Sequence, residues 1–146
     1  MNVYALIIVC ALVGEYILSL LSSALNLGSL RTTLPTEFSG VFGEERYAQS
    51  QKYTYTRTKF GLVHSTVSLL IILAWWQAGG FEWLDHLVRT LGYGPVFTGL
   101  LYIGSLGLAS SVLGLPFRLY STFVIEARYG FNRTTPGTFV VDMLKG

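Results

Sequence analysis

The sequence is short of charged residues. Only 12% of its 146 residues are Asp, Glu, Lys or Arg, against about 25% in ordinary domains, while 51% are hydrophobic. Disordered chains combine low hydrophobicity with high charge, so disorder is excluded. The net charge of +2 comes without a basic stripe, which argues against nucleic-acid binding. A single cysteine, Cys10, excludes an internal disulfide framework and a cysteine-rich zinc site. This composition is typical of an integral membrane protein.

Charge is scarce or missing in three long windows. Residues 2–30 hold one charged residue, Glu15, and residues 60–81 and 90–117 hold none. A spanning helix needs about 20 mostly apolar residues, so we predict spans at about 3–25, 60–78 and 96–115. The first window is not typical of a cleaved signal peptide, because no basic residue precedes it. The predicted fold class is all-α, a polytopic transmembrane helical bundle.

Basic residues predict the orientation of these spans. They gather in the loop after the first span and in the tail after the third, whereas the loop between the second and third spans holds only Arg89. The positive-inside rule then places the N-terminus outside, in a periplasm or lumen, and the first loop and C-terminal tail in the cytosol. A bacterial inner membrane and an endoplasmic reticulum membrane are both compatible with this multi-pass arrangement.

The segments between the spans carry helix signals of their own. Residues 44–60 lack Gly and Pro, and Tyr47, Ser50 and Tyr53 share one face, so a helix is predicted from Glu44 into the second span. The strand-like run 54–56 is a local objection to that helix. At helical spacing, residues 81–91 place their apolar side chains on one face and their polar side chains on the opposite face. This pattern predicts an interfacial amphipathic helix after Gly79 and Gly80.

The third span is expected to continue past Pro116 as a kinked helix, because helical spacing persists beyond it. Gly130 is predicted to cap its C-terminal end. Thr134 or Thr135 is then expected to begin a cytosolic helix, with Pro136 in its first turn.

Two polar residues within the spans are candidates for a functional role. Glu15 is either a cavity-lining, proton-carrying acid or a buried structural carboxyl, and the second interpretation is favoured. His64 is more simply a bundle histidine, hydrogen-bonded to Glu15 or to a serine of the third span, than a ligand. A zinc ion shared by His64 and His86 is excluded, because the intervening helix covers about 20 Å. The sequence also lacks H-E-x-x-H, so no catalytic or metal-ligating residue is predicted in this chain.

The stretch from residue 113 to 145 closely resembles the N-terminal membrane domain of the type I CAAX prenyl proteases, which are integral-membrane zinc metallopeptidases. The matching pattern is a Gly-Leu-Pro and aromatic, a Tyr-x-Thr-Phe-x-Ile-Glu, a Gly-Phe-Asn and a later Asp. Its residues here include Pro116, Tyr120, Phe123, Glu126, Gly130, Phe131, Asn132 and Asp142. Upstream, Glu15, Pro35 and Glu37 resemble family positions as well.

The resemblance implies a fold with seven spans, an outside N-terminus and zinc held by an H-E-x-x-H helix. It implies cleavage of prenylated C-terminal motifs or of membrane proteins, with zinc polarising the scissile carbonyl. In this interpretation the chain is a partial N-terminal membrane domain, inactive alone, whose partners are the bilayer, the remaining spans and the catalytic domain. Zinc and a prenylated or membrane protein substrate are expected only in the full-length enzyme. Glu126 and Asn132 are hypothesised to position the catalytic region, against a favoured alternative of capping and loop bracing only.

A rival interpretation treats the chain as a free-standing three-span scaffold or partner subunit without enzymatic activity. Its assembly surface would be the small face of the third span, formed by Gly104, Gly107, Ser111 and Gly114 at helical spacing. A lipid-binding or transporter fragment is a third and weaker alternative. The reading frame beyond Gly146 discriminates between the first two.

Overall fold

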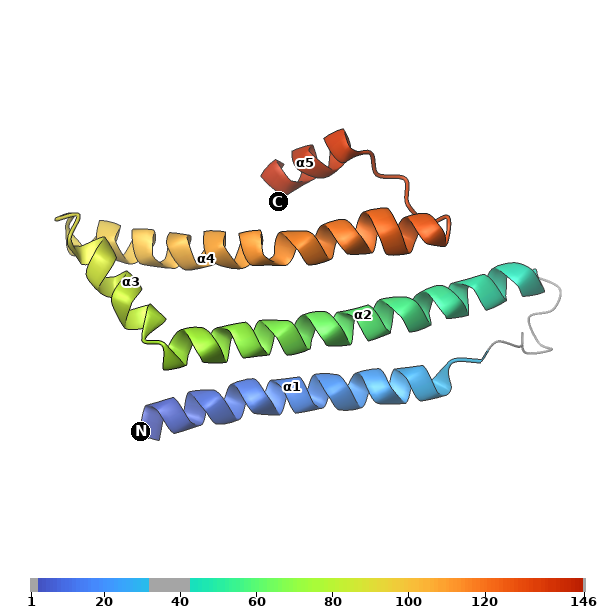
Figure 1. Ribbon diagram of the computed structural model, residues 1–146, viewed down its shortest axis with the longest axis horizontal. Helices are drawn as coiled ribbons and strands as arrows, with labels where there is room; N and C mark the ends of the chain where they lie inside the picture. The colour runs from blue at the N-terminus through green and yellow to red at the C-terminus, as the bar shows by residue number, and fades with distance from the viewer. Residues whose placement is uncertain (1–2, 32–42, 146) are drawn as a thin grey trace. The chain divides into compact units, whose positions relative to one another are not determined.

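The computed structural model describes residues 3–31 and 43–145, and these residues are almost entirely helical. The elements in chain order are α1 (Val3–Ser29), α2 (Glu44–Gln77), α3 (Gly80–Arg89), α4 (Pro95–Tyr120), the π-helical segment η2 (Ser121–Glu126) and α5 (Pro136–Lys145) (Figure 1). Within the described ranges no strand occurs, so the all-α prediction is confirmed. Pro35 and Glu37 lie outside the described residues.

Three helices are long and apolar enough to cross a membrane. They cover Val3–Ser29, Glu44–Gln77 and Pro95–Glu126, and their most apolar windows have mean hydropathies of 2.2, 1.4 and 1.7. None of the residues in these windows is buried inside the chain. Because such apolar surface is stable only against lipid or another apolar partner, the three predicted spans and the membrane class are confirmed.

Helix α2 begins at Glu44 and runs without a break into the predicted second span, as expected. The strand-like residues 54–56 are helical. The hydroxyl of Thr54 donates to the carbonyl oxygen of Ser50, four residues earlier, at 3.0 Å, which is how a threonine is accommodated inside a helix.

Gly79 and Gly80 lie at the junction of α2 and the amphipathic helix α3. Gly79 adopts a left-handed conformation with φ of 70°, which ends α2. At Gly80 a Cβ atom would overlap the indole ring of Trp75, so only glycine fits there without a shift. The same indole meets Trp83 of α3 edge to face at 6.1 Å between ring centroids. The predicted amphipathic helix is present, and Figure 1 shows it between the ends of α2 and α4.

The third span continues through Pro116, as the helical spacing predicted. Helix α4 reaches Tyr120 and passes directly into the wider turns of η2. Proline lacks an N–H group and therefore leaves a carbonyl of the preceding turn without its usual donor. Single-turn π segments occur mostly inside α-helices and are common at functional sites.

The described chain divides into two compact units. Unit 1 comprises Met1–Ser22 and Leu62–Pro116, and unit 2 comprises Ser23–Gly61 and Phe117–Gly146. Every Lys and Arg of the sequence except Arg89 belongs to unit 2. In unit 1 the hydroxyl groups of Tyr16 and Thr66 are hydrogen-bonded at 2.8 Å and hold α1 against α2.

Candidate functional site

The segment that follows the third span closes into a turn in unit 2. Gly130, with φ of 72°, lets the chain reverse, and the carbonyl oxygen of Glu126 accepts hydrogen bonds from the amides of Phe131 at 2.9 Å and Asn132 at 3.2 Å. The amide of Gly130 donates to the carbonyl of Ala127 at 3.1 Å. This pattern satisfies the carbonyls at the end of a helix, so the prediction of Gly130 as a C-terminal cap is confirmed.

One face of α2 packs against this turn. The side-chain amide of Gln49 donates to the carbonyl oxygen of Tyr129 at 2.9 Å, and the hydroxyl groups of Thr56 and Tyr129 lie 2.7 Å apart. The ring of Tyr53 meets the rings of Tyr129 and Phe131, with centroids 5.7 and 4.7 Å away. We call Gln49, Tyr53, Thr56, Tyr129 and Phe131 the tyrosine clasp. It fastens the turn to a helix some 70 residues earlier in the chain.

Sequence reasoning found only part of this clasp. Of the face formed by Tyr47, Ser50 and Tyr53, only Tyr53 belongs to the clasp, whereas the hydroxyl of Ser50 donates to the carbonyl of Tyr47 within α2. The face that contacts the turn carries Gln49 and Thr56 with Tyr53 between them. Their spacing of four and three residues was the available signal.

Aromatic residues continue the contact in unit 2. Phe60, one turn beyond Thr56 on α2, stacks on Tyr120 with centroids 5.0 Å apart and lies 6.0 Å from the ring of Phe117. Farther along the chain, Phe123 meets Phe139 of α5 at 5.6 Å. The signature aromatics Tyr120 and Phe131 therefore pack the end of α4 and the turn against α2, and Phe123 packs η2 against α5.

The polar signature residues have distinct surroundings. The side-chain oxygen of Asn132 accepts a hydrogen bond from the amide of Thr134 at 2.7 Å, which tightens the turn before α5. Thr135 is the residue that caps α5, because its hydroxyl accepts from the amide of Thr138 at 3.2 Å. Glu126 is half-buried, whereas Asp142 on α5 is exposed. Through its carbonyl, Glu126 takes part in the turn as a main-chain acceptor.

The two polar residues predicted within the spans both belong to unit 1. Glu15 is exposed on α1, and His64 is half-buried on α2. A hydrogen bond between these two helices joins Tyr16 and Thr66, which the sequence did not single out. Across the described residues, no group of three or more His, Cys, Asp and Glu side chains is placed to hold a metal ion. The part of the chain that the structure describes therefore does not fit a zinc site.

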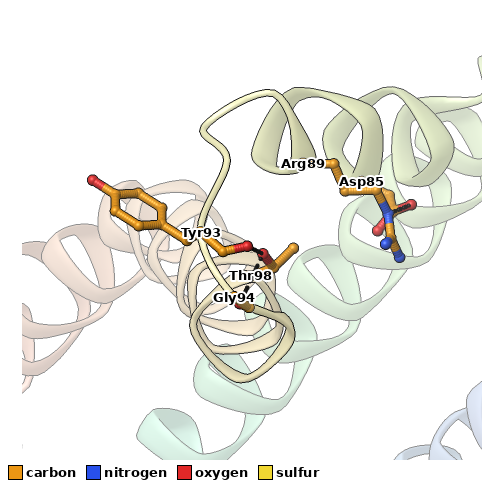
Figure 2. Close-up of polar contacts among 5 residues, drawn as sticks. All are labelled: Asp85, Arg89, Tyr93, Gly94 and Thr98. Carbon is orange, nitrogen blue, oxygen red and sulfur yellow. Dashed lines mark hydrogen bonds and ion pairs between the residues drawn. The ribbon is translucent and has the colours of Figure 1, made fainter.

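An open pocket of about 470 Å³ lies in unit 1 where α3 leads into α4. It is lined by Asp85, Arg89, Tyr93, Pro95, Thr98, Gly99 and Tyr102. Nε of Arg89 donates to the Asp85 carboxylate at 2.7 Å, and the Thr98 hydroxyl lies 3.2 Å from the carbonyl oxygens of Tyr93 and Gly94 (Figure 2).

The ion pair in this pocket is charged at neutral pH. The hydrogen bond from Arg89 is the main cause that lowers the pKa of Asp85, and the same hydrogen bond raises the pKa of Arg89. Because the pKa of Asp85 is lowered in the folded protein, the ion pair favours the folded state at pH values above the ordinary pKa of an Asp side chain. That preference is lost as the pH falls through the pKa of the folded state.

Comparisons with known proteins agree with the helical architecture. A family model described as the CAAX prenyl protease N-terminal region, with five membrane helices, matches residues 24–146. A CAAX prenyl protease 1 homolog of Arabidopsis thaliana is 35% identical over 126 residues, covering 78% of this chain and 28% of the relative. The Homo sapiens homolog is 33% identical, with 78% and 26% covered.

A solved structure has a similar fold. The crystal structure of S. mikatae Ste24p matches with a TM-score of 0.85 and 25% identity, covering 99% of this chain and 35% of that one. The chain thus spans about a quarter to a third of the length of the relatives it matches.

Proposed function

This chain belongs to the CAAX prenyl protease family, by its match to the N-terminal membrane region, and we propose that it is the N-terminal transmembrane portion of a zinc metalloendopeptidase acting on prenylated or membrane proteins. The observation that carries the proposal is the family match over residues 24–146, which includes the whole capped turn after the third span. The family is one of zinc metalloproteases, but the described residues of this chain offer no metal site.

Zinc and its ligands are therefore assigned to parts of the enzyme other than these residues. When bound, zinc supplies Lewis-acid activation of the scissile carbonyl and of water. The residues of this chain have a different task in the proposal. The tyrosine clasp and the Glu126 turn hold the segment after the third span in a fixed conformation, on which the remaining membrane helices assemble.

The first experiment compares residues 1–146 with the product of the complete reading frame. Both are purified in detergent, supplied with a prenylated peptide ending in a CAAX motif, and analysed for zinc. Residues 1–146 are expected to release the terminal tripeptide at least ~1,000-fold more slowly, because mutational loss of catalytic groups costs that much or more. The complete product is expected to carry one zinc per chain.

Two results would contradict this proposal. One is cleavage, or one tightly bound zinc, in residues 1–146 alone. The other is a complete reading frame without an H-E-x-x-H motif, which would favour the three-span scaffold. In that rival interpretation, the face of α4 that carries small residues is the surface for assembly with other proteins. Added Cβ atoms at Gly104, Gly107 and Gly114 would meet no atom within 4 Å among the described residues.

We further propose that the N-terminus lies outside, and that the first loop and the C-terminal tail lie in the cytosol. The support is that all basic residues but Arg89 belong to unit 2. Single cysteines in a Cys10→Ser background test this, because Cys10 is the one native thiol. With a membrane-impermeant maleimide on sealed membranes, Thr90→Cys is expected to react from the outside. Lys52→Cys and Arg128→Cys are expected to react only after permeabilisation, and the opposite pattern would reverse the orientation.

A further inference from the structure

The pocket between α3 and α4 presents a positive and a negative group that both have unused bonding capacity. Arg89 gives one of its five N–H donors to Asp85, through Nε. Among the described residues, the terminal nitrogens of Arg89 donate no hydrogen bond, and the second carboxylate oxygen of Asp85 accepts none. The side chains are 65% and 40% exposed, so both groups are accessible from the pocket. A ligand carrying an anion and a cation a few bonds apart would complement this pair.

The position of the pocket indicates a lipid as the source of such a ligand. Pro95 lines the pocket and is the first residue of the apolar stretch Pro95–Glu126, so the pocket lies where a membrane span begins. Lipid headgroups occupy the region at the end of a span, about 15 Å from the bilayer centre. Trp83 and Tyr93 are 58% and 59% exposed, as expected of aromatic residues at that level.

The neighbouring face of α4 suits acyl chains. Val96, Leu100 and Ile103 follow one another at helical spacing and are 73%, 61% and 70% exposed. The pocket residues Pro95, Gly99 and Tyr102 run beside them, one position earlier at each step. A molecule with its headgroup in the pocket could therefore lay its chains along this apolar row.

We propose that the α3–α4 pocket binds the headgroup of a zwitterionic phospholipid, with the phosphate accepting from the free guanidinium N–H groups of Arg89 and the ammonium donating to Asp85. Thr98 does not donate to the phosphate, because its hydroxyl proton is directed at two main-chain carbonyls. The ring of Tyr93 points away from the ion pair in Figure 2. The lipid would anchor the start of the third span to one leaflet. This inference does not depend on proteolytic activity.

The test measures bound lipid in the product of the complete reading frame by native mass spectrometry. Phosphatidylethanolamine is titrated against the protein, with phosphatidylglycerol as the anionic comparison. We expect one phosphatidylethanolamine to be retained, about 10-fold more tightly than phosphatidylglycerol, because the anionic lipid brings no cation for Asp85. Arg89→Gln is expected to weaken the retained binding about 10-fold. Glu82→Gln, on the same helix but not lining the pocket, is expected to leave it unchanged.

A second pair of variants blocks the pocket without touching its charges. A Cβ at Gly99 or at Gly104 would meet no atom within 4 Å, so leucine is compatible with both positions of α4. Gly99→Leu fills the pocket and is expected to abolish the bound lipid, whereas Gly104→Leu lies outside it and is expected to bind normally. Equal binding in the two leucine variants, equal retention of both lipids, or no effect of Arg89→Gln would overturn the proposal. Displacement of the lipid by soluble glycerophosphoethanolamine would also overturn it, since that result would assign the pocket to a soluble zwitterion.

Discussion

Tyr129→Ala is expected to destabilise unit 2 by about 2–3 kcal/mol. The variant loses the hydroxyl contact with Thr56, worth about 1 kcal/mol, and the ring contact with Tyr53, worth about 1 kcal/mol beyond its buried area. The bond from Gln49 remains, because it ends on the main-chain carbonyl of residue 129. Amide hydrogen exchange over residues 47–57 and 127–132 should therefore become about 30- to 100-fold faster, since each 1.4 kcal/mol corresponds to tenfold.

Graded variants separate the ring of Tyr129 from its hydroxyl. Tyr129→Phe and Thr56→Val each remove one partner of the 2.7 Å contact and should each accelerate exchange about 5-fold, or about 1 kcal/mol. Combined, they should cost little more than either alone, because they remove the same interaction. Tyr55→Ala is the matched control: its ring is exposed and contacts the ammonium of Lys59 at 4.5 Å, a contact worth less than about 1 kcal/mol. Equal effects of Tyr55→Ala and Tyr129→Ala would mean that the clasp does not hold unit 2 together.

The spans could be predicted because the bilayer imposes a constraint that the sequence shows directly. A helix must keep charge out of about 20 consecutive residues, and the three charge-poor windows mark where that happens. The helices are longer than the predicted spans: α1 extends to Ser29, and the third apolar stretch runs to Glu126, past Pro116 as predicted. Helices do not end where the bilayer ends, and their stop signals are capping residues such as Gly130.

Local signals predicted the capped turn, and they predicted α2, but they did not predict that α2 contacts the turn. Gly130 and Pro136 indicate their roles within a few residues, through left-handed backbone and helix-start preferences. The contacts of Tyr129 with Gln49 and Thr56 join positions 80 and 73 residues apart, and no periodicity along the chain encodes them. The ion pair in the α3–α4 pocket could be predicted in part, because residues 85 and 89 lie four positions apart on the polar face of the predicted helix.

The second large effect is expected at Gly130, where the backbone requires a residue without a Cβ. At φ of 72° an L-residue is strained by about 1–2 kcal/mol, and a β-branched residue by about 2–3 kcal/mol. Substitution should therefore weaken the two hydrogen bonds that the Glu126 carbonyl accepts, and expose the amides of Phe131 and Asn132 to exchange. The expected order of exchange rates at these amides, from slowest to fastest, is wild type, then Gly130→Asn, Gly130→Ala and Gly130→Val. Asparagine comes first among the variants because its short polar side chain tolerates the left-handed region.

Gly92 supplies the matched control for this series, because it has the same φ of 72° but belongs to unit 1. A Cβ atom added at either glycine would meet no atom within 4 Å, so backbone strain is the shared effect of both substitutions. Gly92→Ala should speed exchange only around the connection between α3 and α4. Gly130→Ala should do so only in unit 2, by about 10-fold at Phe131 and Asn132, as about 1.4 kcal/mol implies. If Gly130→Ala left those two amides unchanged, or if Gly92→Ala affected them equally, the left-handed glycine would not be what holds the turn. The aromatic contacts of Phe131 with Tyr53 would then have to be sufficient to hold it.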